Sequence, residues 1–258
     1  MPRVAWDPAQ YLKFADHRLR PAIDLLNRIA LDDPGDVYDL GAGAGNVTRL
    51  IKERWPGARV TGVDDSATML AKATATAPGI TWQQADLAAW TPPRPADLIY
   101  SNAALHWLTG HERVFPALLA ALAPGGTLAV QMPRNFGAPS HTLISEAARG
   151  GPWAARLEPL LRPAPVAEPA FYYDVLAPRT AALDVWETEY LQILEGPDPV
   201  KEWTKGTWLR PLLDALEEPE RSRFEARYAE LVGRAYPARG DGRTLFPFRR
   251  LFIVARGR

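Results

Sequence analysis

The chain has 258 residues, enough for one α/β domain with a substantial core or for a core domain that carries an inserted cap. Lysine plus arginine and aspartate plus glutamate number 30 each, with no block of like charge, which disfavours nucleic acid or an acidic membrane as partner. Cysteine is absent, which excludes disulfides, thiol nucleophiles and thiolate metal sites. We expect a soluble, cytoplasmic protein with a small-molecule partner, no membrane segment and no metal.

The first half of the sequence alternates short apolar runs with helical patterns, which is typical of βαβ units around a parallel sheet. A leading helix is expected over 11–29, with a possible break at Pro21. The expected strands are 37–40, 59–63, 80–84, 97–101 and 127–132, and the expected helices are 46–54, 66–76 and 112–122. Ser66 can cap the second of these helices.

The pattern changes after Pro133. Proline occurs 25 times, about twice its usual ~5% share, and much of it lies in 133–178, where we expect long irregular connections. A strand is expected at 182–194, tryptophan-rich helices at 199–236 and a last strand at 248–255. The whole chain, 1–258, is thus predicted to be one α/β domain with a Rossmann-like core at 30–135 and a helical cap at 195–240 inserted before the last strand.

Three glycines stand at alternate positions in VYDLGAGAGNVTRLI (37–51), where the first strand gives way to a helix. The dinucleotide fingerprint needs Gly or Ala three residues beyond its second glycine, but Asn46 occupies that position. The loop ends in Gly45 instead, which gives Asp39-x-Gly41-x-Gly43-x-Gly45. A tight strand-to-helix turn alone could also explain a single motif of this kind.

Acidic residues follow the next two strands: Asp64 after the second and Asp86, in QQADL, after the third. With the glycine pattern, these acids resemble the class I S-adenosylmethionine-dependent methyltransferases. The resemblance implies that Asp64 binds the ribose hydroxyls and Asp86 the adenine amine, with Asp65 as a rival for the ribose. Methionine and ribose would lie over the loop, where backbone must approach closely. Each acid could instead be an ordinary helix cap.

Longer segments narrow the resemblance. Over essentially the full chain, the sequence resembles the trans-aconitate 2-methyltransferases. The segments that carry this resemblance are YLKFADHRLRP (11–21), SNAALHWL (101–108), LAVQMP (128–133), GTWLRP (206–211) and RLFIVAR (250–256). This resemblance implies a mostly parallel seven-stranded sheet with an antiparallel last strand. It also implies methyl esterification of a carboxylate of trans-aconitate, a polycarboxylate, with S-adenosylmethionine as cofactor.

The residues expected at the cofactor lie in the glycine loop and after the second, third and fourth strands. They are Gly41, Ala42, Gly43, Gly45, Asn46, Asp64, Asp65, Met69, Asp86, Leu87, Ser101 and Asn102. Arg18 and Arg20, on the leading helix, are expected to touch the methionine carboxylate or to be structural.

A carboxylate acceptor has a pKa of about 4, so at neutral pH it is already the nucleophile and needs no general base. The protein has only to position it and exclude water. Consistently, none of the four histidines stands in a local sequence that suggests a catalytic dyad, and cysteine is absent. A polyanion should instead be bound by arginine, whose fork meets a carboxylate with two hydrogen bonds.

The expected acceptor-binding arginines are Arg210, then Arg249, then Arg134, which follows the fifth strand. Arg249 and Arg250 are neighbours on a strand and point to opposite faces, so at most one should face the pocket. The alternative for any of them is a solvated surface charge.

His106 and Trp107, directly after the fourth strand, are also expected at the acceptor. His106 could donate a hydrogen bond and would then add a decline in rate near its ordinary pKa of ~6.5. Four aromatic residues could close the site or simply form a core: Trp203, Trp208, Tyr172 and Tyr173.

Two other functions stay open. One is methylation of another small carboxylic acid; the other, in a different class, is a non-catalytic cofactor-binding protein. A nucleic-acid methyltransferase is disfavoured because the fourth strand ends in SNAA (101–104), without the Asn/Asp-Pro-Pro-aromatic turn of the amino-methylating families.

Overall fold

The computed structural model describes residues 15–258, and these divide into two compact units. The first, the sheet unit, contains Leu19–Pro133, Pro165–Thr188 and Arg250–Arg258. The second, the helical unit, contains Arg134–Ala164 and Glu189–Arg249. The cap predicted at 195–240 lies within the helical unit, which also includes residues before β6; the cap itself stays a prediction.

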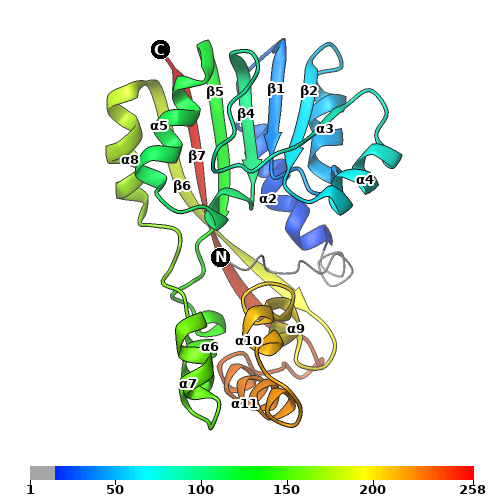
Figure 1. Cartoon of the computed structure of the whole chain (residues 1–258), viewed down its shortest axis with the longest axis vertical. Coiled ribbons are helices and arrows are strands. Elements are labelled where there is room, and N and C mark those ends of the chain that lie inside the picture. The colour runs from blue at the N-terminus through cyan, green and yellow to red at the C-terminus, as the bar shows by residue number, and fades with distance from the viewer. Residues whose placement is uncertain (1–14) are drawn as a thin grey trace. The chain divides into compact units, whose positions relative to one another are not determined.

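Seven strands form one sheet in the order β3-β2-β1-β4-β5-β7-β6, and much of it is visible in Figure 1. The strands are β1 (Asp36–Leu40), β2 (Arg59–Asp64), β3 (Thr81–Gln84), β4 (Ala96–Asn102), β5 (Leu122–Pro133), β6 (Thr180–Leu194) and β7 (Thr244–Gly257). β1 pairs in parallel with β2 and β4, and β4 pairs in parallel with β5, whereas β7 runs antiparallel to β5. The expected mostly parallel seven-stranded sheet with an antiparallel last strand is confirmed.

Helices of the sheet unit connect these strands. They are α2 (Ala15–Asn27), α3 (Asn46–Arg54), α4 (Ala67–Thr76), η1 (Leu105–Trp107), α5 (His111–Ala120), α8 (Pro169–Leu176) and η3 (Ala177–Arg179). Ser66 caps α4 as predicted, with its Oγ accepting from the N–H of Met69 at 3.3 Å. The expected break at Pro21 was wrong: α2 continues through it. The buried side chains of Ala22 and Leu25 explain this, since packing can compensate for one missing hydrogen bond.

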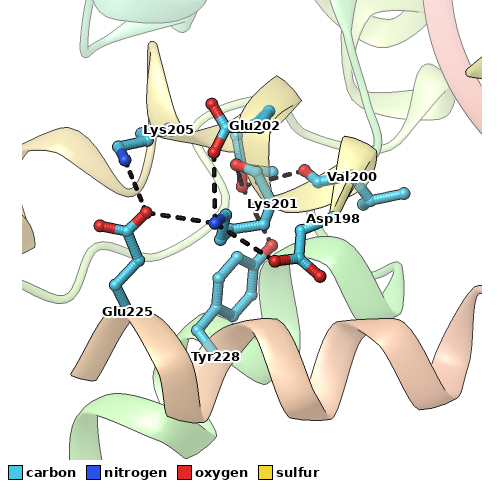
Figure 2. Close-up of polar contacts among 8 residues, drawn as sticks. Asp198, Val200, Lys201, Glu202, Lys205, Glu225 and Tyr228 are labelled. Carbon is cyan, nitrogen blue, oxygen red and sulfur yellow. Dashed lines mark hydrogen bonds and ion pairs between the residues drawn. The ribbon is translucent and has the colours of Figure 1, made fainter. Parts of the chain in front are cut away.

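The helical unit contains α6 (Pro139–Arg149), α7 (Ala154–Leu157), η2 (Glu158–Leu160), α9 (Pro199–Lys205), α10 (Arg210–Asp214) and α11 (Glu220–Ala235). Its core is apolar and includes Trp153, Leu213, Phe224 and Phe246. Figure 2 shows the polar contacts between α9 and α11: Lys201 Nζ lies 3.3 Å from a carboxylate oxygen of Glu225. The long irregular connections expected at 133–178 were wrong. Pro139 and Pro169 stand at the first positions of α6 and α8, where a missing N–H costs nothing.

A buried carboxyl lies at the centre of the sheet unit. Asp39, on β1, accepts a hydrogen bond from Thr48 Oγ1 at 2.6 Å, and burial raises its pKa to about 7 despite that bond. An unfolded chain ionises this group near pH 3.9. Between about pH 4 and 7 the unfolded state is therefore favoured by ionisation, and Asp39 lowers stability as the pH rises.

We therefore expect Asp39→Asn to become more stable relative to wild type as the pH rises from 5 to 7, by about 1.4 kcal/mol per pH unit. Above pH 7 the difference should level off. Urea unfolding of both proteins at several pH values measures it. The difference isolates Asp39, because the buried histidines act on both proteins alike. Stability curves that stay parallel from pH 5 to 8 would contradict this assignment.

Candidate active site

The glycine loop follows β1 and is bonded to β2. The N–H groups of Gly41 and Ala42 donate to the carbonyl oxygen of Val63 at 2.8 and 3.0 Å. Gly41, Gly43 and Gly45 have φ values of +78°, +56° and +80°, which L side chains rarely adopt. Asn46 then begins α3, and its side-chain oxygen accepts from Arg49 at 3.1 Å.

The three glycines are required for different reasons. A Cβ on Gly41 would collide with the Cβ of Ala104, and one on Gly45 would lie 2.6 Å from the ring of Trp82. A Cβ on Gly43 would meet Met69 Cε only at an ordinary 3.6 Å. Contacts within the protein therefore account for Gly41 and Gly45 without a ligand. Only Gly43 leaves room at its Cα, and that room fits the close approach of a bound group.

Asp64 ties this loop to the start of α4. Its Oδ2 accepts from the N–H of Gly43 at 2.8 Å, and its Oδ1 accepts from the N–H of Ser66 at 2.9 Å. Burial raises the pKa of Asp64, although both hydrogen bonds act to lower it. Each carboxylate oxygen keeps a further lone pair, so the group can still accept hydroxyl protons.

The other two acids are exposed. Asp65 presents its side chain to solvent, whereas Asp64 is partly buried. Asp86 is exposed after β3. Its side chain accepts a hydrogen bond from the N–H of Ala88 at 2.9 Å, which closes a local turn. Leu87 is partly buried, within 3.9 Å of where a Cβ on Gly41 would stand.

The end of β4 lies beside the glycine loop. Ser101 is buried and donates to the carbonyl oxygen of Leu40 at 2.9 Å, so its hydroxyl joins β4 to β1. The Oδ1 atom of Asn102 is buried and accepts no hydrogen bond from the described part of the chain. Ala103 follows with φ +54°, a strained value for alanine. Such strain is concentrated at functional sites.

His106 and Trp107 follow in η1. Trp107 is 41% exposed, whereas His106 is buried. Burial lowers the pKa of His106 to about 3, and the charge of Arg250 adds to the effect. The expected loss of a His106 proton near pH 6.5 was therefore wrong, because this imidazole is already neutral there.

A buried chain of hydrogen bonds holds η1. Tyr172 Oη lies 2.7 Å from His111 Nδ1, and His111 Nε2 lies 3.0 Å from the carbonyl oxygen of Leu105. Since that carbonyl can only accept, His111 donates from Nε2 and accepts from Tyr172. Tyr172 is thus a core residue of the sheet unit, and Trp203 is a core residue of the helical unit. Trp208 packs on Phe136 with ring centroids 5.0 Å apart, and Tyr173 is 58% exposed.

The three arginines preferred for the acceptor belong to the helical unit. Arg210 Nε donates to Asp214 at 2.8 Å, and Arg249 lies 3.8 Å from Glu189. The backbone N–H of Arg134 donates to the carbonyl oxygen of Arg249 at 2.9 Å. Their roles at the acceptor stay predictions. The side chain of Arg18 lies outside the described part of the structure, and Arg20 is exposed on α2.

Of the neighbours Arg249 and Arg250, sequence reasoning preferred Arg249 for the acceptor. Arg250 is 4% exposed and Nη1 donates to Gln131 Oε1 at 3.3 Å, whereas the side chain of Arg249 is 48% exposed. The alternation in the first half of β7 carried the signal, since Thr244, Phe246 and Phe248 are buried in phase with Arg250, whereas the residues between them are not. Gln131, fully buried on β5, was not considered as a site residue.

Residues 15–258 contain no cluster of three or more histidine or acidic side chains that could hold a metal ion. None of their helices combines the length and apolar character needed to cross a bilayer.

The family model for a methyltransferase domain matches residues 37–126, the part that carries the glycine loop and β1 to β4. A trans-aconitate 2-methyltransferase of Azoarcus sp. strain BH72 is 52% identical over 250 residues, covering 97% of this chain and 98% of that protein. One of Streptomyces avermitilis is also 52% identical, over 260 residues, covering 97% and 96%.

Among solved structures, the YcgJ protein of Bacillus subtilis is similar in fold, with a TM-score of 0.57 and 14% identity, over 94% of this chain and 99% of that one. The sequence relatives go further, because they match from end to end. The chain therefore belongs to the trans-aconitate 2-methyltransferase family of S-adenosylmethionine-dependent methyltransferases.

Proposed function

We propose that the enzyme transfers the methyl group of S-adenosylmethionine to a carboxylate of trans-aconitate, giving the monomethyl ester and S-adenosylhomocysteine. The main support for this proposal is a relative named trans-aconitate 2-methyltransferase, which is 52% identical and covers 97% of this chain. The intact glycine loop, with its bonded Asp64, supports an active methyltransferase over a non-catalytic binding protein.

The cofactor would be held at the carboxyl ends of β1, β2, β3 and β4. We propose Asp64 for the ribose hydroxyls, Asp86 for the adenine amine and the backbone at Gly43 for the methionine part. The remaining contacts would come from Gly41, Ala42, Gly45, Asn46, Met69, Leu87, Ser101 and Asn102, and Asp65 is the rival of Asp64 for the ribose. When bound, S-adenosylmethionine supplies an electrophilic methyl group on a sulfonium.

The protein has then to position an acceptor that is already ionised and to exclude water. A neutral His106 can donate one hydrogen bond without a charge. We retain Arg210, Arg249 and Arg134 as proposed contacts to acceptor carboxylates, and 195–240 as a cap over the acceptor. We further propose that the enzyme acts in the cytoplasm, without nucleic acid or membrane as partner, on the basis of its cysteine-free and charge-balanced sequence.

The nearest alternative is methylation of another small carboxylic acid. Transfer of label from S-adenosylmethionine to a panel of di- and tricarboxylates would test it. We expect trans-aconitate to give the highest kcat/KM; a clearly better acid would replace it as the acceptor. If label is transferred to none of the acids, the result would support a non-catalytic cofactor-binding protein.

The space at Gly43 predicts a selective effect on cofactor binding. Gly43→Ala should weaken S-adenosylmethionine binding at least about tenfold, because the new methyl occupies that space. Gly79→Ala is the matched control: its φ is +84° and a Cβ there meets nothing within 4 Å. Both variants should lose about 1–2 kcal/mol of stability from the left-handed backbone. Calorimetric titration separates the two effects, and equal affinities in both variants would show that nothing binds over Gly43.

The two neighbouring acids predict a second contrast. Asp64→Asn should weaken S-adenosylmethionine binding by about 1.5–3 kcal/mol, because it removes a charged acceptor. Asp65→Asn should change affinity by less than about twofold, since that side chain is exposed. The measurement is the same titration. If Asp65→Asn shows the larger loss, the ribose role belongs to Asp65.

The pH dependence of the rate should be simple. With an acceptor pKa near 4, kcat/KM should rise through the acid range and stay flat from about pH 6 to 9. His106 should add no decline, since its pKa is about 3, and His106→Gln should keep the same profile. Initial rates at varied pH measure this. A rate that climbs tenfold per unit from pH 7 to 9 would require an acceptor that must lose a proton, contrary to esterification.

A further inference from the structure

A buried polar cluster lies at the carboxyl ends of β4 and β5 in the sheet unit. It consists of Arg250, Gln131 and His106, all at most 6% exposed. We propose that this cluster is an anion subsite that binds a non-reacting carboxylate of the acceptor. The inference rests on the proposed function and names a part of its acceptor site that the sequence did not predict.

Hydrogen bonding within the cluster leaves donors available. Gln131 Oε1 accepts from Arg250 Nη1. This bond orients the amide, so that Nε2 points away from that guanidinium nitrogen. Within the described part of the chain, Gln131 Nε2 and His106 Nδ1 have no hydrogen-bond partner, although both are buried. Buried polar groups are nearly always bonded, so such atoms indicate where a ligand or an ordered water binds. A guanidinium has five N–H donors, so Arg250 can bind Gln131 and further protein groups and still donate to a ligand.

The charge of the cluster selects an anion. Burial and the positive field of Arg250 keep His106 neutral, so that it offers one N–H donor and no second cation. The group that matches a guanidinium, an amide N–H and an imidazole N–H is an acceptor with several lone pairs and a negative charge. A carboxylate has this character.

The cluster adjoins the proposed cofactor loop. Gln131 is the register partner of Asn102, and its carbonyl oxygen accepts from the N–H of Ala103 at 2.9 Å. The next residue, Ala104, abuts Gly41 and leads into η1 with His106. All of these residues belong to the sheet unit. A ligand at the cluster would therefore lie at the edge of the sheet that also carries the glycine loop.

The bound carboxylate should be one that does not react. Methylation converts the reacting carboxylate into a neutral ester, so its charge is already decreasing in the transition state. A guanidinium paired with it would stabilise the ground state more than the transition state and slow the reaction. A second carboxylate of trans-aconitate keeps its charge throughout. Binding of that group lowers KM and selects acids with several carboxylates.

The test compares acceptors and variants. Trans-aconitate is compared with an analogue in which one carboxylate is replaced by hydrogen, for wild type, Arg250→Gln and Gln131→Glu. Gln131→Glu is nearly isosteric and would fill the subsite with a carboxylate of its own. Arg256→Gln is the matched control, an exposed arginine in phase with Arg250 and near the C-terminal end of β7.

We expect both test variants to lose at least thirtyfold in kcat/KM for trans-aconitate, mainly through KM. The preference for trans-aconitate over the analogue lacking the bound carboxylate should fall toward one. Titration of trans-aconitate into the protein saturated with S-adenosylhomocysteine should show the same loss of affinity, with S-adenosylhomocysteine affinity within twofold of wild type. Arg256→Gln should behave as wild type, and Arg250→Lys should keep part of the affinity.

The outcomes separate the subsite from the proposed function. Wild-type protein that neither binds nor methylates trans-aconitate overturns the proposed function, and the subsite with it. Wild-type activity with unchanged affinity in Gln131→Glu overturns the subsite alone, even where Arg250→Gln fails to fold. Loss of the acceptor preference in Arg249→Gln but not in Arg250→Gln also overturns it.

Discussion

The hydrogen bonds of one carboxylate set the geometry of the cofactor edge. Asp64 ends β2 and binds the N–H of Gly43 on one side and the N–H of Ser66 on the other. It thereby fixes the glycine loop after β1 relative to the first turn of α4. Removing the carboxylate from this half-buried position would leave the Gly43 N–H without its acceptor. Loop shape and ribose recognition are therefore coupled through one side chain.

Buried polarity is concentrated at the same edge of the sheet. Asp39, His106, Gln131 and Arg250 are all buried, and burial shifts the pKa of Asp39 upward and that of His106 downward. Both shifts favour the neutral forms, so neither Asp39 nor His106 adds a charge beside the guanidinium of Arg250. A fold selected for stability alone would fill such positions with apolar side chains. Their presence beside the strained Ala103 is more readily explained by ligand binding.

The sequence predicted the sheet unit well because its signals are local. Alternation of strands and helices, the glycines at 41, 43 and 45 and the cap at Ser66 each depend on a few neighbouring residues. The helices within 133–178 were missed because proline counts as a helix breaker by composition, although at a first helical position it is favourable. Only position within the element distinguishes these cases. The burial that permits Pro21 within α2 likewise depends on residues distant in sequence.

The choice between Arg249 and Arg250 could not be made from neighbouring residues alone. Alternation establishes that the two point to opposite faces, but which face is buried depends on the phase of the whole strand. In β7 that phase is set by Thr244, Phe246 and Phe248, which place Arg250 with the buried set. The boundary between the two units also falls between these neighbours. Assigning acceptor selectivity to Arg250 thus assigns it to the unit that carries the glycine loop. One rigid sheet edge would then position both the methyl donor and a fixed end of the acceptor, as catalysis by proximity requires.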